Sequence, residues 1–92
     1  MAPIMVEQRP STGQLERLGV ADWPIWCCEA SAFDQTYERR EVCYLLEGRA
    51  VITPADGGAP IEIGAGDLVL LPAGSSCRWE VLQPLRKHYR LG

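Results

Sequence analysis

Few side chains in this sequence combine a reactive group with an informative position. The segment YERREVCYLLEG places Glu41 at the start of an apolar run, and Cys43 lies within that run. A further thiol, Cys77, follows much later in the chain. The sequence contains one histidine, His88, so a site of two or three histidines cannot be built within one subunit. One carboxylate and two thiols are therefore the first candidates for chemistry.

One hypothesis is a metal site made by Glu41, Cys43 and Cys77. A carboxylate and two thiolates leave a coordination position open for water or substrate, and zinc accepts such ligands. A divalent, zinc-like metal is thus the cofactor that these residues would accept, although the sequence equally allows none. The alternative is that both cysteines are small buried apolar residues, a common place for a free cysteine. No paired spacing such as C-x-x-C supports the metal.

A second hypothesis is an enzyme without a metal. Burial of Glu41 in an apolar pocket would disfavour its charged form and suit it to act as a general base or acid. Cys77 would be a nucleophile if a neighbour stabilised its thiolate. His88 is the only imidazole available to pair with it, and the sequence does not place His88 in the pocket. We expect hydrolase-like or isomerase-like proton transfer rather than redox chemistry, because a non-haem iron site needs histidines that this chain lacks.

A third hypothesis is a binding or structural module without chemistry. Tyr37, Trp79 and Glu41 would hold a small ligand, or the fold would serve mainly as a building block of a dimer. The aromatic residues also have a simpler interpretation, since Trp23, Trp26 and Trp79 would fill the core and its lid. The sequence leaves these alternatives open.

The elements that must position these residues are mostly strands. From Gly48 onward, turn residues recur at short intervals, and short apolar runs such as residues 50–53 and 68–71 lie between them. This pattern predicts an all-β sandwich or barrel. Residues 42–46 and 68–71 are apolar on both alternating faces, so both faces of the sheet should be covered. We expect the N-terminal segment or a second subunit to cover the outer face. We also predict a homodimer formed through sheet-face or strand-edge contacts.

The start of the chain, residues 1–22, is predicted to be an extension that packs on the barrel. The tetrapeptide SerThrGlyGln has the form of a capping box with Ser11 as N-cap, and Gly19 suits a helix end. One short helix is therefore expected. The 92-residue chain is long enough for one domain, and we expect residues 1–92 to form it.

The composition excludes several classes of function. A net charge of -3 argues against nucleic acid, whose binding depends on clustered basic side chains. The pairs Arg39-Arg40 and Arg86-Lys87 are interpreted as solvated surface. No apolar run approaches the ~20 residues of a membrane helix, and no signal peptide is recognisable. The cysteines form no secretory disulfide pattern, so we expect a cytoplasmic protein with free thiols.

Two spaced motifs give a resemblance to a known family. Gly66, Pro72 and Gly74 fit the pattern G-x5-P-x-G, and Glu41 and Gly48 fit E-x6-G upstream of it. These are parts of the two halves of the cupin signature. The chain resembles the small single-domain cupins grouped with ureidoglycine aminohydrolase and the ethanolamine-utilisation cupin. The resemblance implies an all-β, RmlC-like jelly-roll cupin barrel with one short N-terminal helix, and a small cupin of unassigned activity.

The sequence departs from that family at the metal ligands. The cupin signature has three histidines and one glutamate. In this chain the histidine positions fall on Gln35, Tyr37 and Cys77, so only Glu41 matches a usual ligand. If Glu41 points into the barrel, strand alternation predicts a mostly aromatic and apolar lining, as small-molecule sites have. The predicted lining is Phe33, Gln35, Tyr37, Glu41, Cys43, Cys77 and Trp79.

Overall fold

Antiparallel strands make up most of the structure, a computed structural model that describes residues 3–92. Within this range the chain forms seven strands and two helices. The helices are α1 (Thr12–Leu18) and the 3-10 helix η1 (Val20–Asp22). The strands are β1 (Met5–Gln8), β2 (Ile25–Cys28), β3 (Ser31–Thr36), β4 (Glu41–Pro54), β5 (Ile61–Gly64), β6 (Asp67–Leu71) and β7 (Ser76–Leu91).

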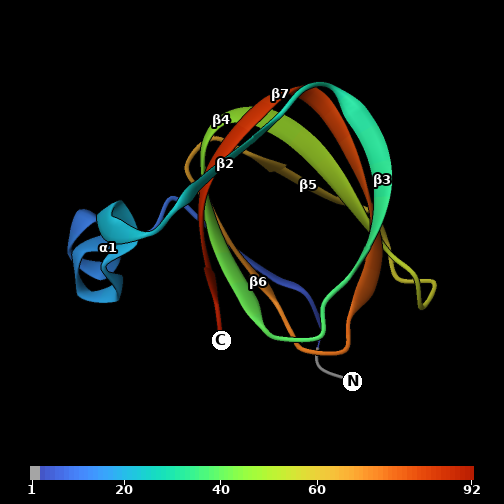
Figure 1. The fold of residues 1–92 in the computed structure, drawn as a ribbon, viewed down its shortest axis with the longest axis horizontal. Coiled ribbons are helices and arrows are strands. Elements are labelled where there is room, and N and C mark those ends of the chain that lie inside the picture. The colour runs from blue at the N-terminus through green and yellow to red at the C-terminus, as the bar shows by residue number, and fades with distance from the viewer. Residues whose placement is uncertain (1–2) are drawn as a thin grey trace.

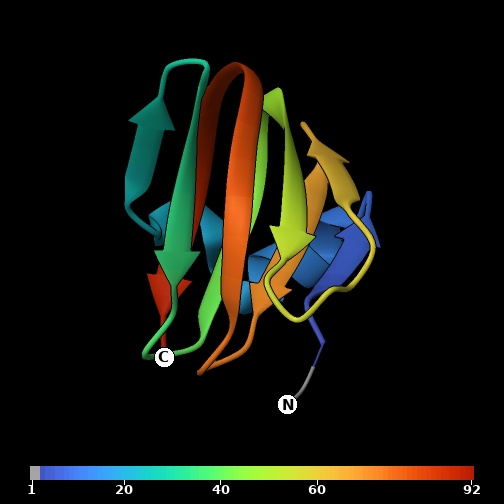
Figure 2. The same cartoon turned by 90° about the vertical axis from the view of Figure 1, so that its right-hand side faces the viewer.

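Two long strands organise the sheet. β4 and β7 pair antiparallel from one end to the other, with Glu41 opposite Leu91 and Pro54 opposite Cys77. β4 also pairs with β6 and then β5, while β7 pairs with β3 and then β2. β1 extends the sheet beyond β6. Figure 1 shows these strands arranged around a common centre, and Figure 2 shows β4 and β7 as neighbouring long ribbons. The predicted all-β barrel is confirmed.

β4 bends in its middle, where its register against β7 shifts. Gly48 lies at this bend with a φ of 97°, a conformation that favours glycine. A Cβ at this position would collide with the backbone carbonyl of Pro84 on β7. The predicted turn glycines Gly66 and Gly74 also have positive φ values, of 93° and 87°. Only glycine lets β4 approach β7 this closely at the bend.

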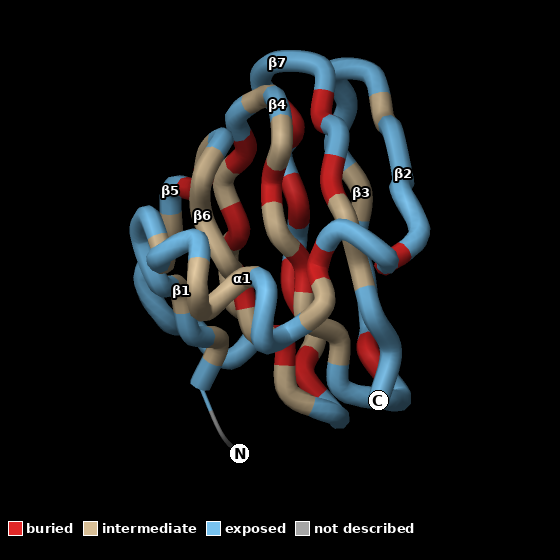
Figure 3. Tube along the Cα trace, turned by 90° about the vertical axis from the view of Figure 1, so that its left-hand side faces the viewer, coloured by how far each residue is buried: buried red, intermediate tan, exposed pale blue. Residues whose placement is uncertain are grey.

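Strand alternation buries the inner face of each long strand. On β4, Cys43 and Leu45 are fully buried, whereas the outward-facing Tyr44 is only half-buried. Figure 3 shows buried stretches that alternate with intermediate and exposed ones along the strands. The core cluster is Tyr37, Cys43, Leu45, Ala50, Ile52, Ile63, Val69, Leu71, Cys77, Trp79, Val81 and Leu85. The barrel interior is therefore filled by side chains, except at the cavity described below.

The N-terminal helix forms as its capping pattern predicts. The Ser11 hydroxyl accepts a hydrogen bond of 3.1 Å from the backbone N–H of Gln14, and Gly19 ends the helix with a φ of 74°. α1 lies outside the ring of strands (Figure 1). Leu15 faces Leu46 across one hollow on the outer surface of the sheet. The second subunit expected on this face stays a prediction. None of the helices in residues 3–92 has the length and apolar character needed to cross a membrane.

Candidate functional site

A cavity of about 230 Å³ opens inside the barrel between β2, β3, β4 and β7. Its lining is Trp26, Phe33, Gln35, Tyr37, Glu41, Trp79, Lys87 and Tyr89. Five of these residues belong to the predicted lining: Phe33, Gln35, Tyr37, Glu41 and Trp79. Aromatic walls with a few convergent polar groups are typical of small-molecule sites.

Larger hollows occur elsewhere on the outer surface, and the ionisable side chains of one of about 440 Å³ beside β1 and β6 are the exposed Glu7, Arg40 and Arg90. The hollow beside the β4–β5 loop measures about 420 Å³, and its one ionisable side chain, Asp56, is exposed. Asp56 accepts a hydrogen bond from the backbone N–H of Gly58, as expected for a turn residue. We therefore place the candidate site in the barrel cavity.

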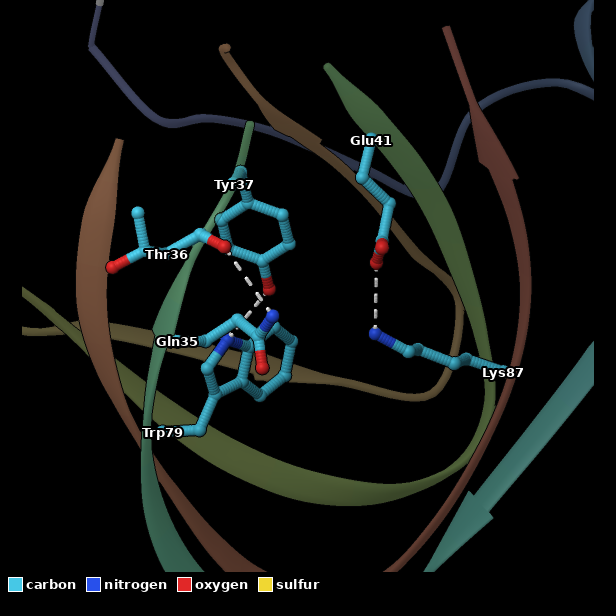
Figure 4. A network of polar contacts seen from close by, with 6 residues as sticks. All are labelled: Gln35, Thr36, Tyr37, Glu41, Trp79 and Lys87. Atoms are coloured by element: carbon cyan, nitrogen blue, oxygen red, sulfur yellow. Dashed lines mark hydrogen bonds and ion pairs between the residues drawn. The ribbon is translucent and has the colours of Figure 1, made fainter. Parts of the chain in front are cut away.

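The central polar feature of the cavity is an ion pair between Glu41 and Lys87. The Lys87 Nζ lies 3.1 Å from the Glu41 Oε2, and 8% and 12% of the lysine and glutamate side chains are exposed. Figure 4 shows the two side chains pointing toward each other from β4 and β7. The interpretation of Lys87 as solvated surface is wrong, although its neighbour Arg86 is exposed and lies 3.9 Å from Glu47 on the outside.

Two indole rings complete the surroundings of the ammonium group. The Lys87 Nζ lies 4.6 Å from the centroid of Trp79 and 5.1 Å from that of Trp26. The negative face of an aromatic ring attracts a cation, and the attraction is stronger where water is excluded. Burying this charge is therefore compensated by one carboxylate and two aromatic faces.

Tyr37 and Trp79 form the opposite wall of the cavity. The Trp79 Nε1 donates a hydrogen bond of 3.0 Å to the Tyr37 hydroxyl oxygen, and Phe33 stacks on Trp79 with the ring centroids 6.2 Å apart. Burial first, and the nearby Glu41 carboxylate second, raise the pKa of Tyr37 far above its usual range. The phenol therefore keeps its proton. Among residues 3–92 this O–H has no acceptor, so it is available to a ligand.

The two cysteines predicted in the lining lie in the packed core instead. Cys43 is fully buried and Cys77 is 3% exposed, and neither lines the cavity. Burial raises the pKa of Cys43 to about 11. Burial also raises the pKa of Cys77, an effect that the nearby indole N–H of Trp79 partly offsets. Both groups therefore remain thiols near neutral pH, which does not favour Cys77 as nucleophile or either residue as a metal ligand.

The residues at this site do not fit a metal ion. Within the part of the chain that the structure describes, no group of three or more His, Cys, Asp or Glu side chains is arranged to hold one. The proposed set of Glu41, Cys43 and Cys77 is therefore not assembled. The Lys87 ammonium lies against the one remaining carboxylate and supplies the positive charge there. This arrangement leaves no donor set for zinc.

His88 lies outside the barrel. It follows Lys87 on β7, so it points to the opposite face, where it lines an outer hollow with Tyr44. Its Nδ1 lies 2.8 Å from the carbonyl oxygen of Trp23. The pair of Cys77 and His88 considered from the sequence is therefore not formed.

Three lining residues were missed as site residues: Trp26, Lys87 and Tyr89. Strand alternation along β7 is the sequence signal that identifies Lys87 and Tyr89 as lining residues. Counting by twos along β7 from Cys77 through Trp79 reaches Lys87 and Tyr89 on the same face. The sequence predicts Trp26 only as a filler of the core or its lid, whereas the structure places it at the cavity rim with 37% of the residue exposed.

The polar groups of the cavity can bind a ligand and transfer protons to or from it. Glu41 presents a carboxylate that is able to accept a proton from a ligand or return one. Lys87 and Tyr37 are N–H and O–H donors at the same cavity. Donors fixed in a place that excludes water stabilise negative charge on a ligand oxygen more strongly than water does.

This chain is similar to a known family of domains and to several proteins of known structure. Residues 15–89 match the family model described as EutQ-like cupin domain. A DUF861 family protein from Thermotoga maritima is 46% identical, with a TM-score of 0.93 over 98% of this chain and 100% of the other. A protein of unknown function (DUF1255) from Acidithiobacillus ferrooxidans is 26% identical, with a TM-score of 0.67 over 70% of this chain and 60% of the other.

The EutQ protein of Clostridium difficile shows the same fold at lower identity. It is 21% identical, with a TM-score of 0.62, and the alignment covers 96% of this chain and 66% of the EutQ chain. A search of curated proteins found no match. The fold and the matched residues confirm the resemblance seen in the sequence motifs. The chain belongs to the family of EutQ-like cupin domains.

Proposed function

We propose that this cupin binds a small molecule in the barrel cavity and catalyses proton transfer on it. Glu41 is the general base or acid, and Lys87 and Tyr37 donate hydrogen bonds to a ligand oxygen on which negative charge develops. The observation that carries the proposal is the Glu41–Lys87 pair on the cavity wall. Buried ion pairs contribute little net stability, so one that lines a cavity favours a functional role.

The roles of the donors follow from their protonation and position. Tyr37 keeps its proton and has an unused O–H at the cavity, so it offers a neutral donor. Lys87 offers a charged donor 3.1 Å from Glu41, so substrate oxygen and catalytic carboxylate would sit side by side. This geometry supports proton abstraction next to a carbonyl or carboxyl group, a reaction of the isomerase type. A hydrolase-type reaction would instead use Glu41 as the base that activates a water molecule.

The first test is ligand binding. Small carbonyl and carboxylate compounds are screened for a rise in melting temperature of the wild-type protein and of Glu41→Gln. We expect stabilisation of the wild type by at least one compound and its loss in Glu41→Gln, because ligands stabilise the state that they bind. The exposed carboxylate of Asp34 gives a matched control, and Asp34→Asn should keep the shift. Equal shifts in wild type and Glu41→Gln would remove Glu41 from the site.

The second test is the chemistry itself. Compounds that bind are incubated with the protein in D₂O, and proton NMR follows exchange of the hydrogens next to their carbonyl group. We expect exchange that depends on the wild-type protein and falls by about 100-fold or more in Glu41→Gln, a typical contribution of acid–base catalysis. Binding without exchange would identify a binding module, the alternative that the aromatic walls also favour.

The cellular setting is part of the same proposal. The four cysteines are free thiols, and Cys27 is exposed. Exposed free thiols persist in reducing compartments, which supports a cytoplasmic location. Localisation of a tagged full-length protein by fractionation would test this.

A further inference from the structure

The one lysine of this chain is buried in the barrel. The sequence has nine basic residues other than histidine, of which eight are arginines. All eight arginines are exposed, whereas Lys87 is 6% exposed and lines the cavity. Solvated positive charge is therefore supplied only by arginine, and the single primary amine of a side chain is placed at the candidate site.

Lysine differs from arginine in one chemical respect that matters here. A lysine amine that loses its proton is a nucleophile, and it forms Schiff bases with carbonyl compounds, whereas the guanidinium of arginine stays charged and unreactive. A need for positive charge alone does not explain this choice of residue at the one enclosed position. A need for a nucleophilic amine does.

The neighbours of Lys87 supply what Schiff-base formation requires. The Glu41 Oε2 is 3.1 Å from the Nζ, so it is within reach to take a proton from the ammonium. The phenol of Tyr37 lines the same cavity and is available to a carbonyl oxygen. Trp26 and Trp79 flank the amine, and Lys87 is only 6% exposed, which limits the access of water that would hydrolyse the product.

We propose that Lys87 forms a Schiff base with a small aldehyde or ketone bound in the cavity. The inference rests on the proposed function in one respect, namely that the cavity binds a small molecule. It goes beyond it in naming a covalent intermediate and a carbonyl substrate class.

The step balances without any further reagent. Glu41 takes a proton from the Lys87 ammonium, and the amine nitrogen adds to the carbonyl carbon, forming a C–N bond while the carbonyl π electrons move to oxygen. One proton is then transferred from the added nitrogen to that oxygen, which gives a neutral carbinolamine. Loss of that hydroxyl as water, with the proton returned by Glu41, breaks the C–O bond and leaves a protonated imine. Overall, ammonium and carbonyl give iminium and water.

Reductive trapping tests the proposal directly. The full chain is incubated with pyruvate or with glycolaldehyde in the presence of sodium cyanoborohydride, which reduces an imine to a stable secondary amine. Peptide mass spectrometry then measures labelling at Lys87, the one lysine of the sequence, and at the N-terminal amine. The N-terminal amine is thus an internal standard for unassisted reaction.

We expect Lys87 to be labelled at least about 10-fold faster than the N-terminal amine by one of the two probes, and about 100-fold more slowly in Glu41→Gln. Lys87→Arg keeps the charge and should lose only the Lys87 label. Labelling of Lys87 no faster than that of the N-terminus would overturn the proposal. This comparison is made within the wild-type protein, so it holds even if a variant fails to fold.

Saturation-transfer NMR on the same samples measures binding of the probe separately from formation of the Schiff base. A probe that binds the wild-type cavity without labelling Lys87 overturns the Schiff base and leaves the proposed binding function standing. Absence of both binding and labelling overturns the Schiff base and counts against the cavity as a carbonyl site. Rapid labelling that is unchanged in Glu41→Gln supports the Schiff base and contradicts the role of Glu41.

Discussion

The Nζ of Lys87 lies 3.1 Å from the Oε2 of Glu41 on the inner wall of the barrel, with 8% and 12% of the two side chains exposed. In the β4–β7 register the backbone of Lys87 is opposite Leu45. The long lysine side chain therefore extends along the inner face of β4 to reach the carboxylate at the start of the strand. The ion pair therefore links β4 and β7, the two long strands of the barrel, at the cavity.

Stability should depend strongly on keeping this pair whole. Lys87→Met leaves a buried carboxylate without its partner, and we expect a loss of about 3–5 kcal/mol in the free energy of unfolding, measured by urea denaturation. Glu41→Gln should cost a comparable amount. The double variant should be less destabilised than the sum of the two, because neither charge is then left alone.

The exposed ion pair between Asp34 and Arg78 provides the control. Its atoms lie 3.4 Å apart, with 84% and 52% of the two side chains exposed. Asp34→Asn should cost at most about 1 kcal/mol. A cost for Lys87→Met as small as that of Asp34→Asn would mean that water reaches the Glu41–Lys87 pair freely.

The bend of β4 gives a second prediction. Gly48→Ala would place a Cβ against the carbonyl of Pro84, whereas Gly66→Ala meets nothing within 4 Å although its φ of 93° is equally strained. Forcing an L-residue into this conformation costs roughly 1–2 kcal/mol. We expect about that loss for Gly66→Ala and at least about 2 kcal/mol more for Gly48→Ala. Equal losses in chemical denaturation would show that β7 moves aside at no cost.

The barrel follows from the sequence more completely than the candidate site does. The turn glycines and the apolar runs predict the barrel because each has a local physical cause. Alternation predicts which face a residue occupies, and it placed Tyr37 and Trp79 correctly inside. It does not give depth along the barrel, so Cys43 and Cys77 were expected in the cavity although they lie in the packed core. Local sequence predicts Lys87 as surface because its partner, Glu41, lies 46 residues away in the sequence, and only the pairing of β4 with β7 brings the two together.

The buried thiol of Cys43 predicts a specific loss of stability at high pH. Its pKa rises from 9.0 to about 11 in the folded protein, so the thiol form is favoured in the native state. The contribution is fully present below pH 9 and is lost as the pH rises toward 11, because the unfolded chain releases its proton first. The expected loss is about 2–3 kcal/mol.

Cys43→Ala isolates this effect. Burial raises the pKa of Tyr37 and of Cys77 as well, so the wild type will lose stability at high pH for three reasons. The difference in unfolding free energy between wild type and Cys43→Ala should therefore shrink between pH 9 and pH 11, by about the amount assigned to the thiol. A difference that stays constant across this range would mean that Cys43 titrates normally.

Metal removal gives the last prediction. Lys87 occupies the side of Glu41 that a cation would need, and no third ligand from His, Cys, Asp or Glu gathers there within residues 3–92. We therefore expect EDTA or 1,10-phenanthroline to leave the melting temperature unchanged. Plasma mass spectrometry of protein purified without oxygen should find no stoichiometric metal in the wild type. Glu41→Ala and Cys77→Ser serve as comparisons, because near-stoichiometric zinc that disappears in both variants would require Lys87 to leave Glu41 and Cys77 to rotate out of the core.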